Sequence, residues 1–163
     1  MILTAIQQSS LNTDAWSLIR KTQSPAELKT FVENITDVVI SYIESVQKQK
    51  AANIITQVKA LVEKNYARDA SLETVASQVF ISPCYLSVIF KKETNITFKN
   101  YLIQTRIEKA KELLEKTDLK IYDIAEKVGY NNTRYFSELF QRICGKTPSQ
   151  YRASHNPSMP QDI

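Results

Sequence analysis

Glycine is scarce in this sequence: Gly129 and Gly145 are the only two among 163 residues. The β-branched residues do not alternate with polar ones over any sustained stretch, so the sequence favours helices over strands. No apolar run approaches the roughly 20 residues of a membrane helix, and residues 1–10 place no charged segment before their apolar side chains. The sequence therefore predicts an all-α protein with no membrane span and no signal peptide.

Cysteine and histidine are scarce as well, and this limits the chemistry that the chain can perform. Cys84 and Cys144 have neither metal-ligand spacing nor the pattern of a disulfide framework, and the single histidine is His155. This cysteine usage is typical of a cytoplasmic protein. We find no nucleophile–base pair, no metal-ligand spacing and no glycine-rich phosphate loop, so we predict no enzyme and no cofactor.

One stretch of the chain occurs twice. Segments 75–101 and 124–151 align with an offset of 49 residues before a central turn and 50 residues after it, as Leu86 and Phe136 illustrate. The second copy therefore carries one extra residue in its turn. A repeat of this length that keeps its apolar positions indicates two copies of one structural module.

Each copy has the pattern of a helix-turn-helix. In the second copy, residues 123–128 have the apolar spacing of a short helix, Gly129 supplies left-handed backbone, and another helix runs to Gly145. That second helix is predicted to carry these side chains inward: Tyr135, Phe136, Leu139, Phe140 and Ile143. In a helix-turn-helix the second helix enters the major groove of DNA.

The first copy replaces both glycines. Asn95 stands in the place of Gly145, and asparagine is the next best residue for a left-handed helix end. Phe80 stands in the place of Gly129, and phenylalanine does not adopt a positive φ without cost. We therefore expect a different turn geometry in the first copy.

The sequence predicts three parts. They are an N-terminal helical segment over residues 1–50, a DNA-binding domain over 51–154 and a disordered tail over 155–163. Within the domain we expect a first helix-turn-helix at about 71–95, a connecting helix at about 98–116 and a second helix-turn-helix at about 121–145. The connecting helix is about 28 Å long, a reach that can hold two helices in major-groove segments one turn apart. The net charge of +4 lies entirely beyond Ala51, which fits a nucleic-acid partner.

The N-terminal segment contains a short heptad pattern. Ser24, Pro25 and Glu27 form a capping box that starts a long helix. Five residues then follow at alternating spacings of three and four: Val32, Ile35, Val39, Tyr42 and Val46. The pattern suits either an amphipathic helix packed on its own domain or a helix that forms a homodimer or transmits a signal. The polar run 47–50 suggests a linker or a helix boundary after it.

The repeat region resembles the AraC/XylS family of bacterial transcription regulators. The resemblance covers about residues 52–152 and is most specific where Gly129-Tyr130 precedes Tyr135-Phe136-Ser137 and where Gly145-Lys146-Thr147-Pro148 follows. The preceding helical run looks like the inter-domain segment of YesN-like response regulators, although the chain has no receiver pattern. The resemblance implies a double helix-turn-helix fold, double-stranded DNA as partner, and RNA polymerase as a further candidate partner.

Helix geometry and the resemblance together indicate which residues read bases. The candidates are Cys84, Ser87 and Val88 in the first copy and Thr133, Arg134, Ser137 and Glu138 in the second. Arg134 suits a bidentate contact to guanine, and Glu138 can accept from cytosine N4. The first set is small and weakly polar, so we expect modest specificity from it. A solvated surface without base contact is the alternative for every one of these residues.

A second set of residues is expected to contact phosphates. The candidates are Lys91, Lys92, Lys99, Gln141, Arg142, Lys146 and Arg152, together with the backbone N–H groups near Ser71 and Ile121. Two other classes of function stay open. Cys84 lies in the first turn of a helix, where the helix dipole favours a thiolate, so a redox or alkylation sensor is one alternative. A helical module that binds a partner protein is the other.

Overall fold

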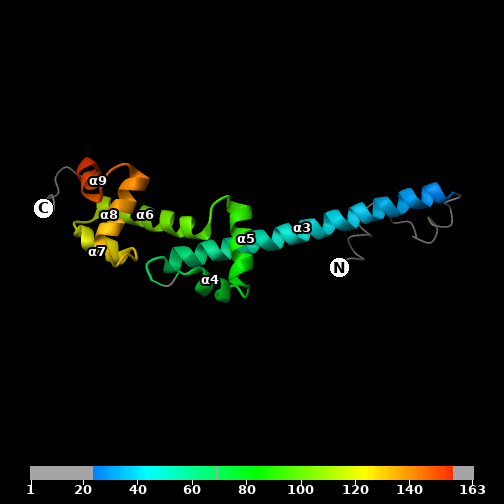
Figure 1. Ribbon diagram of the computed structural model, residues 1–163, viewed down its shortest axis with the longest axis horizontal. Helices are drawn as coiled ribbons and strands as arrows, with labels where there is room; N and C mark the ends of the chain where they lie inside the picture. The colour runs from blue at the N-terminus through cyan, green and yellow to red at the C-terminus, as the bar shows by residue number, and fades with distance from the viewer. Residues whose placement is uncertain (1–23, 69, 156–163) are drawn as a thin grey trace. The chain divides into compact units, whose positions relative to one another are not determined.

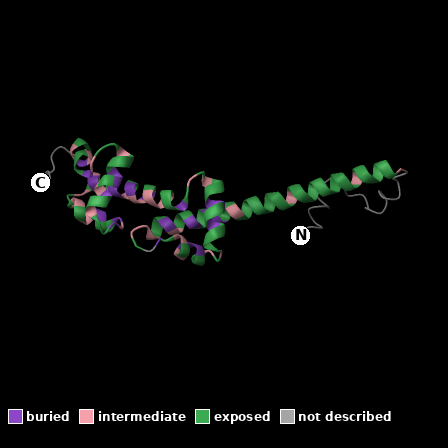
Figure 2. Cartoon of the chain, in the orientation of Figure 1, coloured by how far each residue is buried: buried purple, intermediate pink, exposed green. Residues whose placement is uncertain are grey.

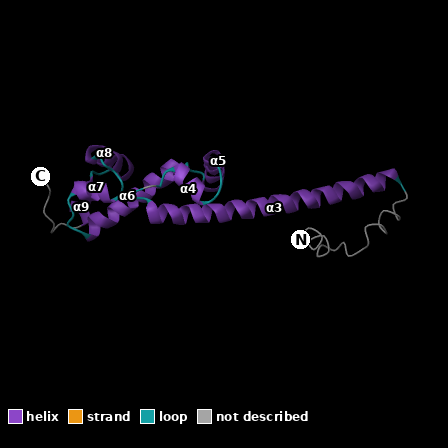
Figure 3. Cartoon of the chain, turned by 90° about the horizontal axis from the view of Figure 1, so that it is seen from below, coloured by secondary structure: helices purple, strands orange, loops and turns teal. Residues whose placement is uncertain are grey.

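The computed structural model describes residues 24–68 and 70–155. Every regular element in these ranges is a helix (Figures 1 and 3), so the predicted all-α fold is confirmed. The helices are α3 (Pro25–Asn65), α4 (Leu72–Gln78), α5 (Pro83–Thr94), α6 (Phe98–Lys116), α7 (Ile121–Lys127), α8 (Thr133–Cys144) and α9 (Pro148–His155). His155, which we assigned to a disordered tail, is the last residue of α9, and the rest of that tail lies outside the described residues.

Helix α3 begins at the predicted capping box, where the Glu27 backbone N–H donates to Ser24 Oγ at 3.3 Å. The helix continues through residues 47–50, so a helix boundary at this polar run was wrong. Lysine and glutamine are good helix formers, and a polar run without glycine or proline does not interrupt a helix. The contacts of the chain group it into two units, Met1–Gln49 and Lys50–Ile163.

The first unit buries none of the described residues of α3. Most of its large apolar side chains, including Val32, Val39 and Val46, are 36–54% exposed, whereas Phe31 and Tyr42 are half-buried. The residues of α3 that are buried all lie in the second unit: Ile54, Ile55, Val58 and Val62. Figure 2 shows the same change of burial along the helix.

The second unit contains two hydrophobic cores, one for each copy of the repeat. The first core joins the buried part of α3 to Val75, Ala76, Leu86, Ile89, Phe90 and Phe98. The second core consists of Ile107, Ala110, Leu114, Ile124, Ala125, Val128, Tyr130, Phe136, Leu139 and Phe140. Helix α6 contributes to both cores, Phe98 to the first and Ile107 to the second. The repeat that the sequence shows is therefore a repeat of core positions.

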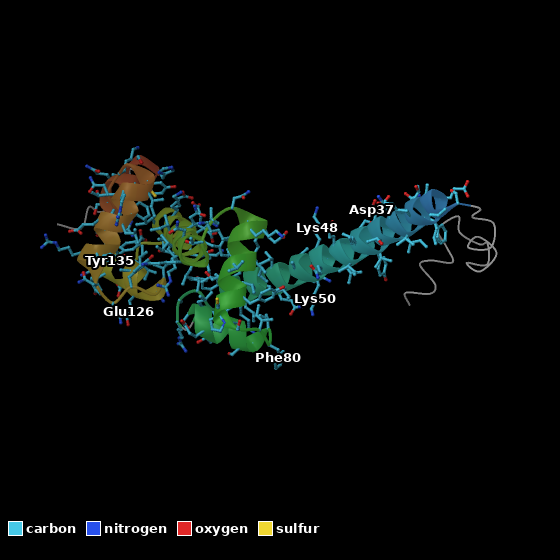
Figure 4. The ribbon with its side chains drawn as sticks, turned by 45° about the vertical axis from the view of Figure 1, so that its right-hand side comes forward. Asp37, Lys48, Lys50, Phe80, Glu126 and Tyr135 are labelled. Carbon is cyan, nitrogen blue, oxygen red and sulfur yellow. The ribbon has the colours of Figure 1, made fainter. Side chains whose placement is uncertain are left out.

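Two apolar residues of α8 do not follow the expected pattern. Tyr135 and Ile143 are 46% and 44% exposed, so the prediction that both point inward was wrong. Both lie at the edges of the apolar stripe whose centre is buried, and Phe136 and Phe140 fill the core instead. Tyr135 is labelled in Figure 4.

The second helix of each copy begins and ends in the same way. Ser82 Oγ accepts from the Tyr85 backbone N–H at 3.2 Å, and Asn132 Oδ1 accepts from the Tyr135 backbone N–H at 2.9 Å. Asn95 ends α5 with φ 60°, and Gly145 ends α8 with φ 75°. Side-chain caps at the start and left-handed residues at the end fix the length of both helices.

The turn between the two helices is also the same in both copies, contrary to our expectation. Phe80 has φ 57°, in the left-handed region like Gly129 with φ 93°. The next residue donates its backbone N–H back to an alanine carbonyl in each copy, Ile81 to Ala76 at 3.1 Å and Tyr130 to Ala125 at 2.8 Å. The extra residue of the second copy therefore falls after Tyr130, at Asn131.

Within the described ranges, no single helix is long and apolar enough to cross a membrane. The pair α4 and α5 passes such a test only when the two helices are counted together across their 94° bend.

Candidate nucleic-acid interface

The first copy presents the outer face of α5. Helices α4 and α5 meet at 94°, an angle typical of a helix-turn-helix. Leu86, Ile89 and Phe90 bury one side of α5. The opposite side exposes the three predicted base-reading residues, Cys84, Ser87 and Val88, and Val88 is 61% exposed. This face offers a thiol, a hydroxyl and two methyl groups, and it carries no charge among those three residues.

The second copy presents a more polar face on α8. Arg134 and Glu138 are exposed, whereas Thr133 and Ser137 are half-buried. Arg134 Nε donates to Glu138 Oε1 at 3.0 Å, with side-chain exposures of 89% and 63%. An exposed ion pair one turn apart is worth little in water, so either partner can exchange it for a contact with a base. The two helices therefore differ in chemistry although their backbones are alike.

Most of the predicted phosphate contacts are exposed cations. Lys91, Lys92, Lys99, Arg142 and Lys146 are all exposed, as is Gln141. None of the five cations forms an ion pair with another described residue. Lys91 and Lys92 lie in the last turn of α5, where positive charge also complements the helix dipole.

Arg152 is the exception, and its assignment as a phosphate contact was wrong. Its residue is only 6% exposed, and its guanidinium donates from Nη2 to the Leu119 carbonyl. The repeat explains this burial, because the matching residue of the first copy is the partly buried Leu102. Arg152 therefore holds α9 against the loop that follows α6.

The two predicted helix starts differ. Ser71 Oγ accepts from the Thr74 backbone N–H at 3.1 Å and caps α4. Lys120 occupies the matching position before α7 and makes no side-chain cap. The N–H groups at Ile121 are therefore not satisfied by a side-chain cap, whereas one of those after Ser71 is.

The two cysteines differ in exposure. Cys84 is exposed in the first turn of α5. Cys144 ends α8 and is half-buried, and this burial raises the pKa of its thiol.

Sequence reasoning missed Arg106, which joins three segments of the second unit. Its Nε donates to the Tyr66 carbonyl at 2.8 Å, and its Nη1 donates to the Gly129 carbonyl at 3.0 Å. Its guanidinium also lies 5.2 Å from the centre of the Tyr130 ring. The sequence does indicate that Arg106 faces the core, since it stands three residues after Ile103 and four before Ala110, on the apolar side of its helix.

Comparison with known proteins decides the family. A model described as a helix-turn-helix domain matches residues 75–154. The C-terminal domain of the two-component response regulator yesN from Fusobacterium nucleatum is 41% identical, with a TM-score of 0.56, and the match covers 58% of this chain and 93% of that one. The chain belongs to the AraC/XylS family of helix-turn-helix transcription regulators.

Two further proteins extend the comparison. The DNA-binding domain of AdpA, solved in complex with a target DNA, is 25% identical with a TM-score of 0.60, and the match covers 66% of this chain and 97% of that one. The uncharacterized regulator YijO of Escherichia coli is 32% identical over 130 residues, which are 80% of this chain and 45% of YijO. The chain thus spans less than half the length of this curated relative. None of these comparisons supports a thiol sensor or a protein-interaction module.

Proposed function

We propose that this chain is a transcription regulator that acts in the cytoplasm by binding double-stranded DNA at specific sequences, without catalysis. In this proposal α5 and α8 enter two successive segments of the major groove. The observation that carries it is the repeated module, in which each second helix buries one face in its own core and exposes the opposite one. The AdpA domain, which has the same fold, was solved with its target DNA.

The two helices have different roles in this proposal. Arg134 on α8 contacts a guanine, and Glu138, its ion-pair partner, orients the guanidinium or accepts from a cytosine. Ser87 and Val88 on α5 offer a hydroxyl and methyl groups, which suit thymine methyl contacts and contribute less discrimination. Most of the specificity therefore comes from α8.

The exposed cations supply affinity in this proposal. Lys91, Lys92 and Lys99 lie around the first copy, and Arg142 and Lys146 around the second. Neutralised phosphates release counterions, so the logarithm of the binding constant falls by about 0.9 per phosphate contact and per decade of salt. An affinity that does not fall as the salt concentration rises would contradict this part of the proposal.

The experiment is selection of random duplex DNA by the purified full chain, followed by binding measurements on the enriched sequences. The proposal expects a bipartite site whose halves are about one helical turn apart. Enrichment of one half alone would mean that α5 only positions the protein. No binding to any duplex at low salt would overturn the proposal.

A second partner is suggested by the exposed apolar residues of α3. We propose that Val32, Ile35, Val39, Tyr42 and Val46 form the seam of a homodimer. Val32, Val39 and Val46 repeat every seven residues, the repeat by which a helix keeps one apolar seam facing a partner helix. RNA polymerase stays a predicted partner on the family resemblance alone.

The dimer is tested by sedimentation of the full chain. Val39→Ser removes a seam residue, and Asp37→Ser is the matched control, two residues away and not one of the five seam residues; Asp37 is labelled in Figure 4. The proposal expects a concentration-dependent dimer for the unmodified chain and for Asp37→Ser, and a weaker one for Val39→Ser. Monomers at all concentrations would contradict the dimer and leave the DNA-binding proposal untouched.

A further inference from the structure

Arg106 contacts the residue that follows α3 and the turn of the second copy of the repeat. Tyr66 directly follows Asn65, the last residue of α3, and α3 supplies Val58 and Val62 to the first core. Gly129 forms the turn of the second helix-turn-helix. One guanidinium therefore bonds the Tyr66 carbonyl at the end of α3, at 2.8 Å, and a carbonyl in the turn of the second copy, at 3.0 Å. The side chain of Tyr66 itself packs against the second core.

The two carbonyls suit the fork of an arginine. The Tyr66 carbonyl is among those that a helix leaves without a partner at its C-terminus. Nε and Nη1 are fixed in one plane and donate to different acceptors at the same time, which the single ammonium of lysine does not reproduce. The ring of Tyr130 lies 5.2 Å from the guanidinium and shields it on one side.

Gly129 gives independent evidence that this junction is close-packed. A Cβ added there would lie 2.8 Å from the Ala67 carbonyl oxygen and 2.9 Å from Arg106 Cζ. The matching turn of the first copy carries Phe80, whose side chain is 94% exposed. Glycine is therefore required in the second turn by the approach of two other segments, and the first turn has no such neighbours.

We propose that Arg106 is a positioning residue that fixes the second helix-turn-helix against the end of α3, and so sets the spacing between the two half-sites that the chain accepts. This inference rests on the proposed function. Arg106 itself is half-buried and makes no contact with DNA in it. Without its two hydrogen bonds, the end of α3 keeps the packing of Tyr66 against the second core and the Glu63–Lys109 ion pair at 3.9 Å. The polar tie between the end of α3 and the turn of the second copy is lost.

The test uses duplexes in which the selected half-sites are kept and their spacing is changed. One added or removed base pair rotates one half-site by about 34–36° around the duplex. The unmodified full chain is expected to lose about tenfold or more in affinity at either altered spacing. Arg106→Met keeps the apolar stem and removes the donors, and its affinity is expected to change less than threefold with spacing. Its binding to a duplex with one half-site is expected to stay within about twofold of the unmodified chain.

Matched variants separate positioning from charge and folding. Lys116→Met removes the same charge from an exposed position of the same helix and is expected to keep the spacing preference. Gly129→Ala keeps every charge but places a Cβ against Arg106 and the Ala67 carbonyl, and is expected to make the affinity depend less on the half-site spacing. Gly145→Ala is its control, because a Cβ there meets no atom within 4 Å. If Arg106→Met loses helicity, Arg106→Lys keeps charge and stem and serves the same test.

The outcomes distinguish this inference from the proposed function. A folded Arg106 variant with the spacing preference of the unmodified chain would overturn the positioning role. Failure of the unmodified chain to bind any duplex would overturn the proposed function itself, and the inference with it.

Discussion

Phe80 and Gly129 occupy the same position in two copies of one turn, and both have left-handed backbone, with φ of 57° and 93°. The hydrogen bonds that close the two turns are also the same. The turn geometry is therefore imposed by the two helices and the core between them, since a residue without glycine's freedom adopts it as well. Position 129 requires glycine for a second reason, because a Cβ there would collide with Arg106 and with the Ala67 carbonyl.

Phe80→Gly is expected to stabilise the fold. Left-handed backbone costs a residue with a Cβ about 1–2 kcal/mol, and the exposed ring of Phe80 buries almost nothing that would be lost (Figure 4). Part of this gain is offset by the greater freedom of glycine in the unfolded chain, so we expect a net gain of about 0.5–1 kcal/mol. Urea unfolding measures it, and Phe80→Ala, which keeps a Cβ, is the control. A glycine variant less stable than the alanine variant would contradict this account.

The repeat, the helix ends and most of the core could be predicted from the sequence. The cap at Ser24 marks the start of its helix through local chemistry, and the spacing of Phe136 and Phe140 follows from the helical period. Phe80 was misjudged because a local backbone cost of this size is small beside the packing of two helices. The tertiary fold overrode the local preference there.

The burial of Arg152 and the hydrogen bonds of Arg106 depend on contacts between helices, so neighbouring residues in the sequence do not predict them. The burial of Arg152 depends on where α9 packs, and its sequence neighbours give no sign of the Leu119 carbonyl. The bonds of Arg106 depend on the end of α3, forty residues earlier in the chain. Charge alone predicts exposure, and both arginines depart from that rule.

Arg152→Leu is expected to keep both the fold and the salt dependence of DNA binding. Leucine stands at the matching position of the first copy, Leu102, so an apolar side chain suits this site. Arg152→Ala also removes the donor to the Leu119 carbonyl and, unlike leucine, leaves the buried site partly empty, so it is expected to cost about 2–3 kcal/mol. Thermal unfolding and salt titration measure the two effects. If the slope of log binding constant against log salt concentration were shallower by about 0.9 in Arg152→Leu, Arg152 would be a phosphate contact after all.

Tyr151 is expected to make stability depend on alkaline pH. Burial, and then the hydrogen bond from its hydroxyl to Glu115 Oε1 at 2.7 Å, raise the pKa of Tyr151 to about 12 from an ordinary 10.0. The neutral phenol is therefore favoured in the fold. Its stabilising effect is complete below pH 10 and is lost as the pH rises to about 12, because the unfolded chain releases the proton first.

Tyr151→Phe should therefore show a smaller loss of stability than the unmodified chain between pH 10 and 12, in urea unfolding at a series of pH values. Tyr122→Phe, which removes an exposed phenol, is the control and should follow the unmodified chain. Equal slopes in all three proteins would argue against the shifted pKa.

Arg134→Ala is expected to cost about 1–3 kcal/mol on the selected site and to relax the preference at one base pair. Arg142→Ala, on the same helix, is expected to weaken binding equally on all sequences and to reduce the salt slope by about 0.9. Competition binding with duplexes changed at single positions measures both. Uniform loss in Arg134→Ala would make that residue a phosphate contact instead.

Hydroxyl-radical footprinting of the full chain on its selected site shows whether the two copies of the repeat bind two segments of one duplex. Two protected patches are expected on one side of the duplex, with their centres about one helical turn apart. Arg134→Ala is expected to weaken the patch under α8 more than the patch under α5. A single protected patch of one half-site at saturating protein would contradict binding by both copies.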